Sequence, residues 1–336
     1  MGQADDPLLA VRGLTTVIDG EAGPLTVVDR MSFDLAAGET LCIVGESGCG
    51  KSMLALSILR LFPDPPVRLQ AGSALFRGHD LLRLANDKLR DVRGDRLAMI
   101  FQEPMSALNP VMNIGKQIGE VLRRHRKMRA SEIRSRAIEL LTKVRIPDPE
   151  RRLHDYPHQL SGGMRQRAMI AMALACDPEV LIADEPTTAL DVTIQAQILH
   201  LIRDLQRDTN AATILITHNL GVVAEMADRV LVMYAGTKVE EAPVDALFDR
   251  PAHPYTRGLM ASMPHPRAGD EAPEKLAEIP GVVPPLDAMP PGCRFAPRCA
   301  FATDRCRTTA PALEEVGSAH AVACWEWRRV AEERAA

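Results

Sequence analysis

The stretch GESGCGKS, residues Gly45–Ser52, decides how this chain folds, because it lies between the apolar run TLCIV (residues 40–44) and the helix-forming MLALSILR (residues 53–60). It matches the pattern G-x-x-x-x-G-K-[ST] in the strand-and-helix context that a phosphate-binding loop requires. The glycines let the backbone curl, so that successive amides and the helix N-terminus face an anion. We expect phosphate contacts from Gly45, Glu46, Ser47, Gly48, Cys49 and Gly50, with Lys51 between the β- and γ-phosphates and Ser52 on Mg²⁺.

Short apolar runs alternate with helical segments along the rest of the chain: ETLCIV, RLAMIFQ, EVLIA, ATILIT and RVLVMY, which begin at residues 39, 96, 179, 212 and 229. This alternation predicts an α/β core with a buried, mostly parallel sheet. The β-type pattern disappears between Gln102 and Leu160, so a helical subdomain over about residues 103–165 is expected to interrupt the sheet. Its clearest helix would bury Ile133, Ala137, Leu140, Leu141 and Val144. A later helix, capped by Asp191, would bury Ile194, Ile198, Leu201, Ile202 and Leu205.

The composition is that of a globular protein with a real core. The chain has 336 residues, of which 46% are hydrophobic and 25% charged, and a net charge of −4 that does not suggest a bulk nucleic-acid binder. No apolar run approaches the ~20 residues of a membrane-spanning helix. The N-terminal MGQADDPLLAVRG is acidic and lacks the apolar core of a signal peptide. A cytoplasmic location is therefore expected, where structural disulfides are rare.

The run VLIADE, residues 180–185, supplies carboxylates for the same chemistry. Its four apolar residues predict a buried strand that delivers Asp184 and Glu185 at its carboxyl end, where ligands bind in open α/β sheets. Asp184 suits a contact to Mg²⁺ through water, and Glu185 suits polarisation of an attacking water. Taken alone, an acidic strand end could also be accidental.

The segment LSGGMRQR, residues 160–167, resembles the signature segment of ABC-type ATPases. Ser161, Gly162 and Gly163 would open a helix and leave its N-terminus clear for an anion. Because the phosphate loop already holds the chain's own nucleotide, the resemblance implies that this second site serves ATP on a partner subunit. It also implies roles for three further residues: Gln102 on Mg²⁺ or water, Asp191 near the dimer seam, and His218 as a γ-phosphate sensor. The resemblance covers about Leu8 to Glu241.

The chain departs from that family at the adenine contact. Most ABC ATPases stack the base on an aromatic side chain near the first strand, but residues 8–30 contain no Phe, Tyr, Trp or His. By spacing, Ile18 or Val17 takes that place. An aliphatic contact loses a stacking term of ~0.5–1.5 kcal/mol, so base selectivity is expected to be weak.

The sequence after Pro243 is rich in proline and predicts an irregular extension. ALFDRPAHPYTRGLMASMP (residues 246–264) and GCRFAPRCAFATDRC (residues 292–306) resemble the C-terminal region of oligopeptide and dipeptide importer ATPases. We expect a nucleotide-binding domain over residues 1–250 and this C-terminal region over residues 251–336. The resemblance implies the D-type ATP-hydrolysing subunit of a peptide importer, at the cytoplasmic face of the inner membrane. Its implied partners are a second, related ATPase, two membrane permease subunits and an external substrate-binding protein.

Other functions stay open at this point. Relatives of this type also carry nickel or glutathione, and a soluble ABC ATPase without transport is a further alternative. A module that binds ATP without turnover is disfavoured, because Lys51, Asp184, Glu185 and His218 are all intact.

Four late cysteines, Cys293, Cys299, Cys306 and Cys324, stand in a segment with little regular structure of its own. Such a segment buries little apolar surface and is expected to need a cross-link, and four thiolates suit tetrahedral zinc or a [4Fe–4S] cluster. The paired C-x₂₋₄-C spacing of zinc sites is missing, and the importer resemblance implies the iron–sulfur cluster. We expect its role to be structural, because nothing in the sequence places it beside the phosphates. Scattered buried thiols are the alternative, as at Cys42, Cys49 and Cys176.

Overall fold

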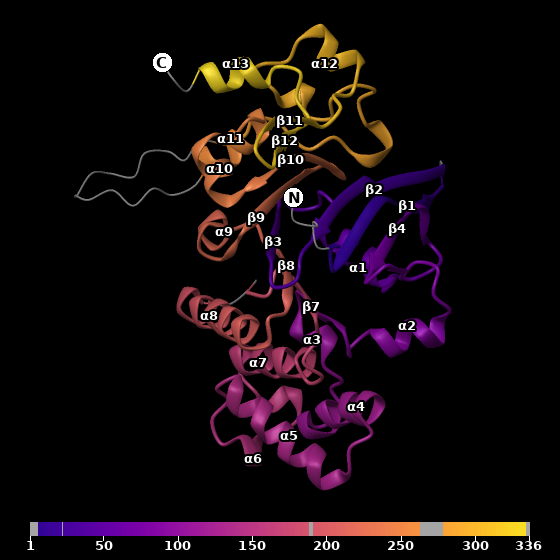
Figure 1. The fold of residues 1–336 in the computed structure, drawn as a ribbon, viewed down its shortest axis with the longest axis vertical. Coiled ribbons are helices and arrows are strands. Elements are labelled where there is room, and N and C mark those ends of the chain that lie inside the picture. Colours follow the sequence, from indigo (N-terminus) through magenta and orange to yellow (C-terminus); the bar gives the residue numbers. More distant parts are fainter. Residues whose placement is uncertain (1–5, 22, 188–190, 263–277, 334–336) are drawn as a thin grey trace, which may run out of the picture. The chain divides into compact units, whose positions relative to one another are not determined.

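The chain divides into two compact units, each assembled from separate segments of the sequence. The first unit comprises Met1–Ala10, Asp34–Thr40 and Leu75–Ile216, and the second comprises Val11–Phe33, Leu41–Ala74 and Thr217–Ala336. The computed structural model describes residues 6–21, 23–187, 191–262 and 278–333. Figure 1 shows their helices and strands.

Parallel strands form the sheet of the first unit: β6 (Leu97–Ile100), β7 (Val180–Asp184) and β8 (Ala212–Ile216). The register pairs Ile100 with Ala183, and Ile182 with Ile214. Every residue of these strands is buried, as expected for parallel strands covered on both faces. The apolar runs of the sequence therefore predicted them correctly.

A group of helices fills residues 103–165 of the first unit without any strand, and this confirms the predicted helical insertion. Its helix α5 (Ala130–Lys143) contacts α4 (Ile114–Arg126) and α7 (Gly162–Ala173), as Figure 1 shows. The buried residues of α5 are those expected from its spacing, and Val144 at its C-cap is also buried. The other elements of this unit are β5 (His79–Asp80), α2 (Asn86–Val92), α3 (Pro104–Ala107), α6 (Pro149–Arg152), η1 (Pro157–Gln159) and α8 (Val192–Thr209).

The helix α8 begins after Asp191 as predicted, but the capping contact is different. The exposed Asp191 side chain makes no capping hydrogen bond, and its backbone carbonyl accepts the N–H of Gln195 at 2.8 Å. The prediction that the Asp191 side chain caps α8 was therefore wrong: the carboxylate stays exposed to water, which solvates it in place of the helix N–H groups. On the apolar face, Ile194 is only half-buried, whereas Ile198, Leu201, Ile202 and Leu205 are buried.

The second unit contains two groups of strands. The first group has the order β2 (Gly23–Leu35), β1 (Leu9–Gly20) and β4 (Val67–Phe76). In the second group, β3 (Thr40–Val44) runs parallel to β9 (Arg229–Tyr234), which pairs antiparallel with β10 (Thr237–Pro243). The helices of this unit are α1 (Lys51–Leu59), α9 (Leu220–Met226), α10 (Val244–Asp249), α11 (Pro254–Ala261), α12 (Asp304–Thr308) and α13 (Trp327–Glu332), with η2 (Leu286–Ala288) and η3 (Ala296–Arg298). Across the described residues of both units, no helix is long and apolar enough to cross a membrane.

The residues after 250, called the C-terminal region below, are more regular than an extension laid on the core. Its β12 (His320–Val322) pairs antiparallel with β10, and β11 (Glu314–Gly317) pairs with β12, so the region continues the sheet. The fully buried carboxylate of Glu240 on β10 accepts the N–H groups of Ala252 (2.6 Å) and His253 (3.0 Å) and contacts Nε2 of His320 at 2.8 Å. A buried carboxylate is stable only with such partners, so these contacts hold the region to β10.

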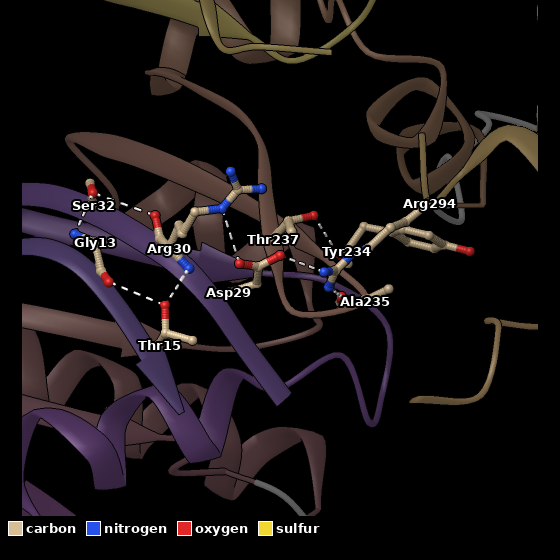
Figure 2. A network of polar contacts seen from close by, with 9 residues as sticks. All are labelled: Gly13, Thr15, Asp29, Arg30, Ser32, Tyr234, Ala235, Thr237 and Arg294. Atoms are coloured by element: carbon tan, nitrogen blue, oxygen red, sulfur yellow. Dashed lines mark hydrogen bonds and ion pairs between the residues drawn. The ribbon is translucent and has the colours of Figure 1, made fainter. Parts of the chain in front are cut away.

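A second polar network attaches the C-terminal region to β2, and Figure 2 shows it at close range. The guanidinium of Arg294 donates to the Asp29 carboxylate at 2.5 Å and to the carbonyl oxygen of Ala235. The Asp29 N–H donates to the carbonyl oxygen of Gly236 at 2.9 Å. Both charged side chains are only 17% exposed, so the pair is partly removed from water.

Candidate functional site

The phosphate loop joins β3 to α1 and depends on its glycines for space. Gly50 is the N-cap of α1 with φ of 100°, and a Cβ there would lie 2.6 Å from the carbonyl oxygen of Val27. A Cβ on Gly45 would lie 2.2 Å from the carbonyl oxygen of Met233. Both distances are too short for any other residue. The loop therefore has the bare backbone, followed at once by a helix N-terminus, that suits a polyphosphate.

Lys51 lies across this loop and is 5% exposed. Its Nζ donates to the carbonyl oxygens of Gly45 at 2.8 Å and Glu46 at 3.0 Å. Ser52 follows in the first turn of α1 and is half-buried, while Ser47 and Gly48 are exposed at the loop surface. Burial raises the pKa of the Cys49 thiol, which therefore stays neutral near pH 7.

The two carboxylates at the end of β7 have different surroundings. Asp184 is 4% exposed, whereas Glu185 is half-buried and its backbone has φ of 43°. A non-glycine residue in the left-handed region is uncommon, and such strain is concentrated at functional sites. The Glu185 N–H donates to the carbonyl oxygen of Ile216 at 2.9 Å, and its Oε2 accepts Nε2 of Gln102 at 3.0 Å. The structure thus brings together Gln102 and Glu185, two residues proposed from sequence for one reaction.

The signature segment opens α7 as expected. Ser161 is the N-cap, its Oγ accepts the N–H of Met164 at 3.4 Å, and Ser161 and Gly162 are both exposed. The exposed helix N-terminus is consistent with an anion arriving from outside this unit.

Gln166, in the same segment, was not singled out from the sequence. Its side chain is 2% exposed, and its Nε2 donates to the carbonyl oxygen of Pro186 at 2.6 Å. This bond connects the first turns of α7 to the residue that follows Glu185. The sequence could have indicated this residue, because Gln166 lies inside LSGGMRQR at a position that becomes part of a buried helix face, where an apolar residue is usual.

His218 is exposed in the turn before α9. The preceding Thr217 donates its N–H to the carbonyl oxygen of Ile43 at 3.2 Å, and Asn219 caps α9 by accepting the N–H of Gly221 at 2.9 Å. Within the second unit, the hydrogen bond of Thr217 therefore places the neighbouring His218 next to β3, the strand that precedes the phosphate loop.

The structure distinguishes the two candidates for an adenine contact. Val17 is fully buried in β1, whereas Ile18 is half-buried. A side chain without exposed surface has nothing to offer a ligand, so Ile18 is the one of the pair that could contact a base.

The four late cysteines line one small cavity, together with His253, Phe295, Phe301 and Trp325. Burial raises the pKa of Cys299 to about 11 and that of Cys324 to about 12, so these thiols are neutral near pH 7. Within residues 6–21, 23–187, 191–262 and 278–333, no group of three or more His, Cys, Asp or Glu side chains is arranged to hold a metal ion. The four cysteines share one cavity as expected, but the described residues show no metal-ready geometry for the predicted cluster.

Two stretches of the chain match known families. Residues 28–188 match the family described as ABC transporter, and residues 239–306 match the one described as oligopeptide/dipeptide transporter, C-terminal region. A "probable peptide ABC transporter ATP-binding protein" of Sinorhizobium fredii is 55% identical over 325 residues, which are 97% of this chain and 96% of that protein. A Brucella abortus relative, also named for peptide import and ATP binding, is 51% identical over 311 residues, 93% of this chain and 92% of its own length.

Solved structures share the fold at lower identity. A dimeric ATP-binding cassette in a post-hydrolysis state, bound to ADP and Pi, has a TM-score of 0.63 and 26% identity and covers 70% of this chain and 98% of its own. A component of an ABC transporter complex from Clostridium perfringens has a TM-score of 0.61 and 25% identity and covers 73% and 92%. The predicted α/β class with an inserted group of helices is that of these structures.

Proposed function

Since this chain belongs to the ABC transporter ATP-binding proteins and carries the C-terminal region of the oligopeptide/dipeptide class, we propose that it is the ATP-hydrolysing subunit that powers peptide import. The observation that carries the proposal is 55% identity over 97% of the chain to a relative named for peptide transport. That span includes the C-terminal region as well as the phosphate loop. We also propose that the chain divides near residue 250, into a nucleotide-binding domain and the C-terminal region.

In this proposal the phosphate loop binds ATP through its backbone amides, and Lys51 bridges the β- and γ-phosphates. Ser52, Asp184 and Gln102 would hold Mg²⁺, which supplies neutralisation of phosphate charge when bound. Glu185 takes a proton from the attacking water, with Gln102 holding its carboxylate in place at 3.0 Å. His218 would contact the γ-phosphate, and Ile18 would cover the adenine.

Hydrolysis in this proposal needs two ATPase subunits. Ser161, Gly162 and Gly163 would contact ATP held on the partner subunit, and Asp191 would lie near the seam between the two. The partner is a second, related ATPase, and the pair would dock on two membrane permease subunits at the cytoplasmic face of the inner membrane. An external binding protein would deliver the cargo. The exposed N-terminus of α7 supports this arrangement, because an exposed helix N-terminus can receive an anion from another subunit.

Uptake by the reconstituted transporter tests the proposed cargo. Proteoliposomes that contain the four membrane and ATPase subunits and the binding protein should accumulate labelled dipeptides or oligopeptides only when MgATP is supplied to the ATPase side. Nickel complexes and glutathione are the matched alternatives. Accumulation of one of these without peptide would change the cargo, and turnover without any accumulation would favour a non-transport ATPase.

We further propose that Cys293, Cys299, Cys306 and Cys324 hold a [4Fe–4S] cluster, with a single zinc ion as the alternative. Their common cavity supports this, because it brings the four thiols to one place. Zinc binds each sulfur at ~2.3 Å and so needs all four sulfurs gathered around one atom. In a cluster each sulfur binds a different iron, so wider spacing is tolerated.

The metal content of the purified protein distinguishes the [4Fe–4S] cluster from the zinc ion. Protein purified without oxygen should be brown, absorb broadly near ~400 nm and contain about four irons per chain. Cys306→Ser should lose the absorbance, whereas Cys176→Ser, at a buried cysteine outside the cavity, should keep it. One zinc per chain without iron would contradict the cluster, while the four cysteines would remain the metal ligands. Protein that contains neither iron nor zinc would contradict both proposals.

A further inference from the structure

Glu46 places a negative charge in the loop that is proposed to bind the phosphates of ATP. Its backbone N–H, its backbone carbonyl oxygen and its side-chain carboxylate each make a hydrogen bond or an ion pair. Its carbonyl oxygen accepts Lys51 Nζ at 3.0 Å. Its N–H donates to the hydroxyl of Tyr255 at 2.7 Å. Its carboxylate pairs with both terminal nitrogens of Arg298, at 2.6 Å from Nη1 and 3.0 Å from Nη2. Two of these partners, Tyr255 and Arg298, belong to the C-terminal region.

Arg298 is itself fixed from several sides. Its side chain is 4% exposed, and it donates to the carbonyl oxygens of Pro280 at 2.9 Å and Ile279 at 3.1 Å. The guanidinium also lies 5.8 Å from the ring of Tyr234 and 5.9 Å from that of Phe295. Hydrogen bonds to Glu46 outweigh burial and raise the pKa of Arg298. The two-pronged pairing with a carboxylate is the strongest form of such a contact, and here its Arg298 side is almost fully buried.

Tyr255 is equally constrained. It is fully buried, and its ring meets that of Tyr234 edge-on with centroids 4.7 Å apart. Burial raises its pKa, so the hydroxyl is neutral and can accept the Glu46 N–H. The position of one loop amide is therefore set by a side chain 209 residues later in the sequence.

We infer that Arg298 and Tyr255 are positioning residues for nucleotide binding: the C-terminal region holds the phosphate loop through Glu46 and thereby sets its ATP affinity. The inference rests on the proposed binding of ATP at this loop. Arg298 neutralises a carboxylate that would otherwise repel the phosphates, and it holds that carboxylate away from the loop amides that the phosphates need. Tyr255 keeps the amide of Glu46 in a fixed direction.

The same segment offers a matched control for a purely structural role. Arg294 lies four positions before Arg298 and also forms a shielded ion pair, but its partner is Asp29 on β2 rather than the phosphate loop (Figure 2). Loss of either arginine should loosen the C-terminal region. Only the loss of Arg298 should change the loop that binds ATP.

The test measures MgATP affinity of the purified full chain, and KM and kcat of the assembled transporter, for paired variants. Arg298→Gln should weaken ATP affinity and raise KM by about tenfold, equivalent to ~1.4 kcal/mol, with kcat within twofold of the parent. Arg298→Lys should recover part of the loss, and Glu46→Gln combined with Arg298→Gln should recover most of it, because no unpaired carboxylate remains. Arg294→Gln should lower the melting temperature as Arg298→Gln does, yet leave ATP affinity within about twofold.

Equal ATP affinities for the parent and Arg298→Gln would overturn the inference, as would equal losses in Arg298→Gln and Arg294→Gln. If Arg298→Gln does not fold, Tyr255→Phe provides the decisive measurement, since it keeps the ring and removes only the acceptor of the Glu46 N–H. It should weaken ATP binding by about threefold, the effect of a lost neutral hydrogen bond, and an unchanged affinity would count against the inference. A parent chain that binds no ATP would contradict the proposed function instead.

Discussion

Glu185→Gln should stop steady-state ATP hydrolysis while ATP binding persists, with kcat lower by ~10²–10⁴-fold, the usual contribution of a general base. Glutamine keeps the size of the side chain but cannot accept a proton from water. The phosphate loop and the proposed Mg²⁺ ligands are unchanged, so ATP affinity should stay within about threefold of the parent. Phosphate release by the assembled transporter gives kcat, and equilibrium binding of MgATP gives the affinity.

A control for this variant lies at the other end of the same strand. Glu179 precedes β7 and pairs with Arg77 and Arg96, both at 2.5 Å. Glu179→Gln should reduce stability by about 1 kcal/mol, as expected for a partly exposed pair, and leave kcat near that of the parent. Turnover of Glu185→Gln within tenfold of the parent would remove Glu185 from the role of base.

The buried strands could be predicted from sequence because they are continuous apolar runs, and β7 shows why this also located part of the site. A strand of five buried residues ends at Asp184, so the carboxylate positions follow from the strand itself. The phosphate loop could be predicted as well, because its motif occupies the consecutive residues 45–52 between a strand and a helix. Features written in consecutive residues were therefore predicted.

Contacts between distant segments could not be predicted in the same way. Arg298 and Glu46 are separated by 252 positions, and nothing in either local sequence names the other as partner. The left-handed backbone conformation of Glu185 could not be predicted either, because the residue is not a glycine. The same holds for the cysteine segment: Arg298, which directly precedes Cys299, pairs with Glu46 of the phosphate loop, and no local pattern indicates this contact.

The Ser161→Arg variant should lower turnover of the assembled transporter by ~10²-fold, comparable to the loss of a donor to a developing phosphate charge. Ser161 is the exposed N-cap of α7, and arginine at this position would lose the cap and fill the approach to the helix N-terminus. In the proposed dimer this approach belongs to ATP on the partner subunit. MgATP affinity of the purified chain, which depends on its own phosphate loop, should therefore change by less than about twofold.

Ser131→Arg is the matched control, since Ser131 is exposed in the first turn of α5 and has no proposed role with nucleotide. It introduces the same charge and bulk, and turnover should stay near that of the parent. The separation of effects is what identifies a shared site: turnover falls in Ser161→Arg although the chain's own ATP site is intact. If instead the purified monomer of the parent hydrolysed ATP at the rate of the full complex, no partner would be needed, and the exposed N-terminus of α7 would require another explanation.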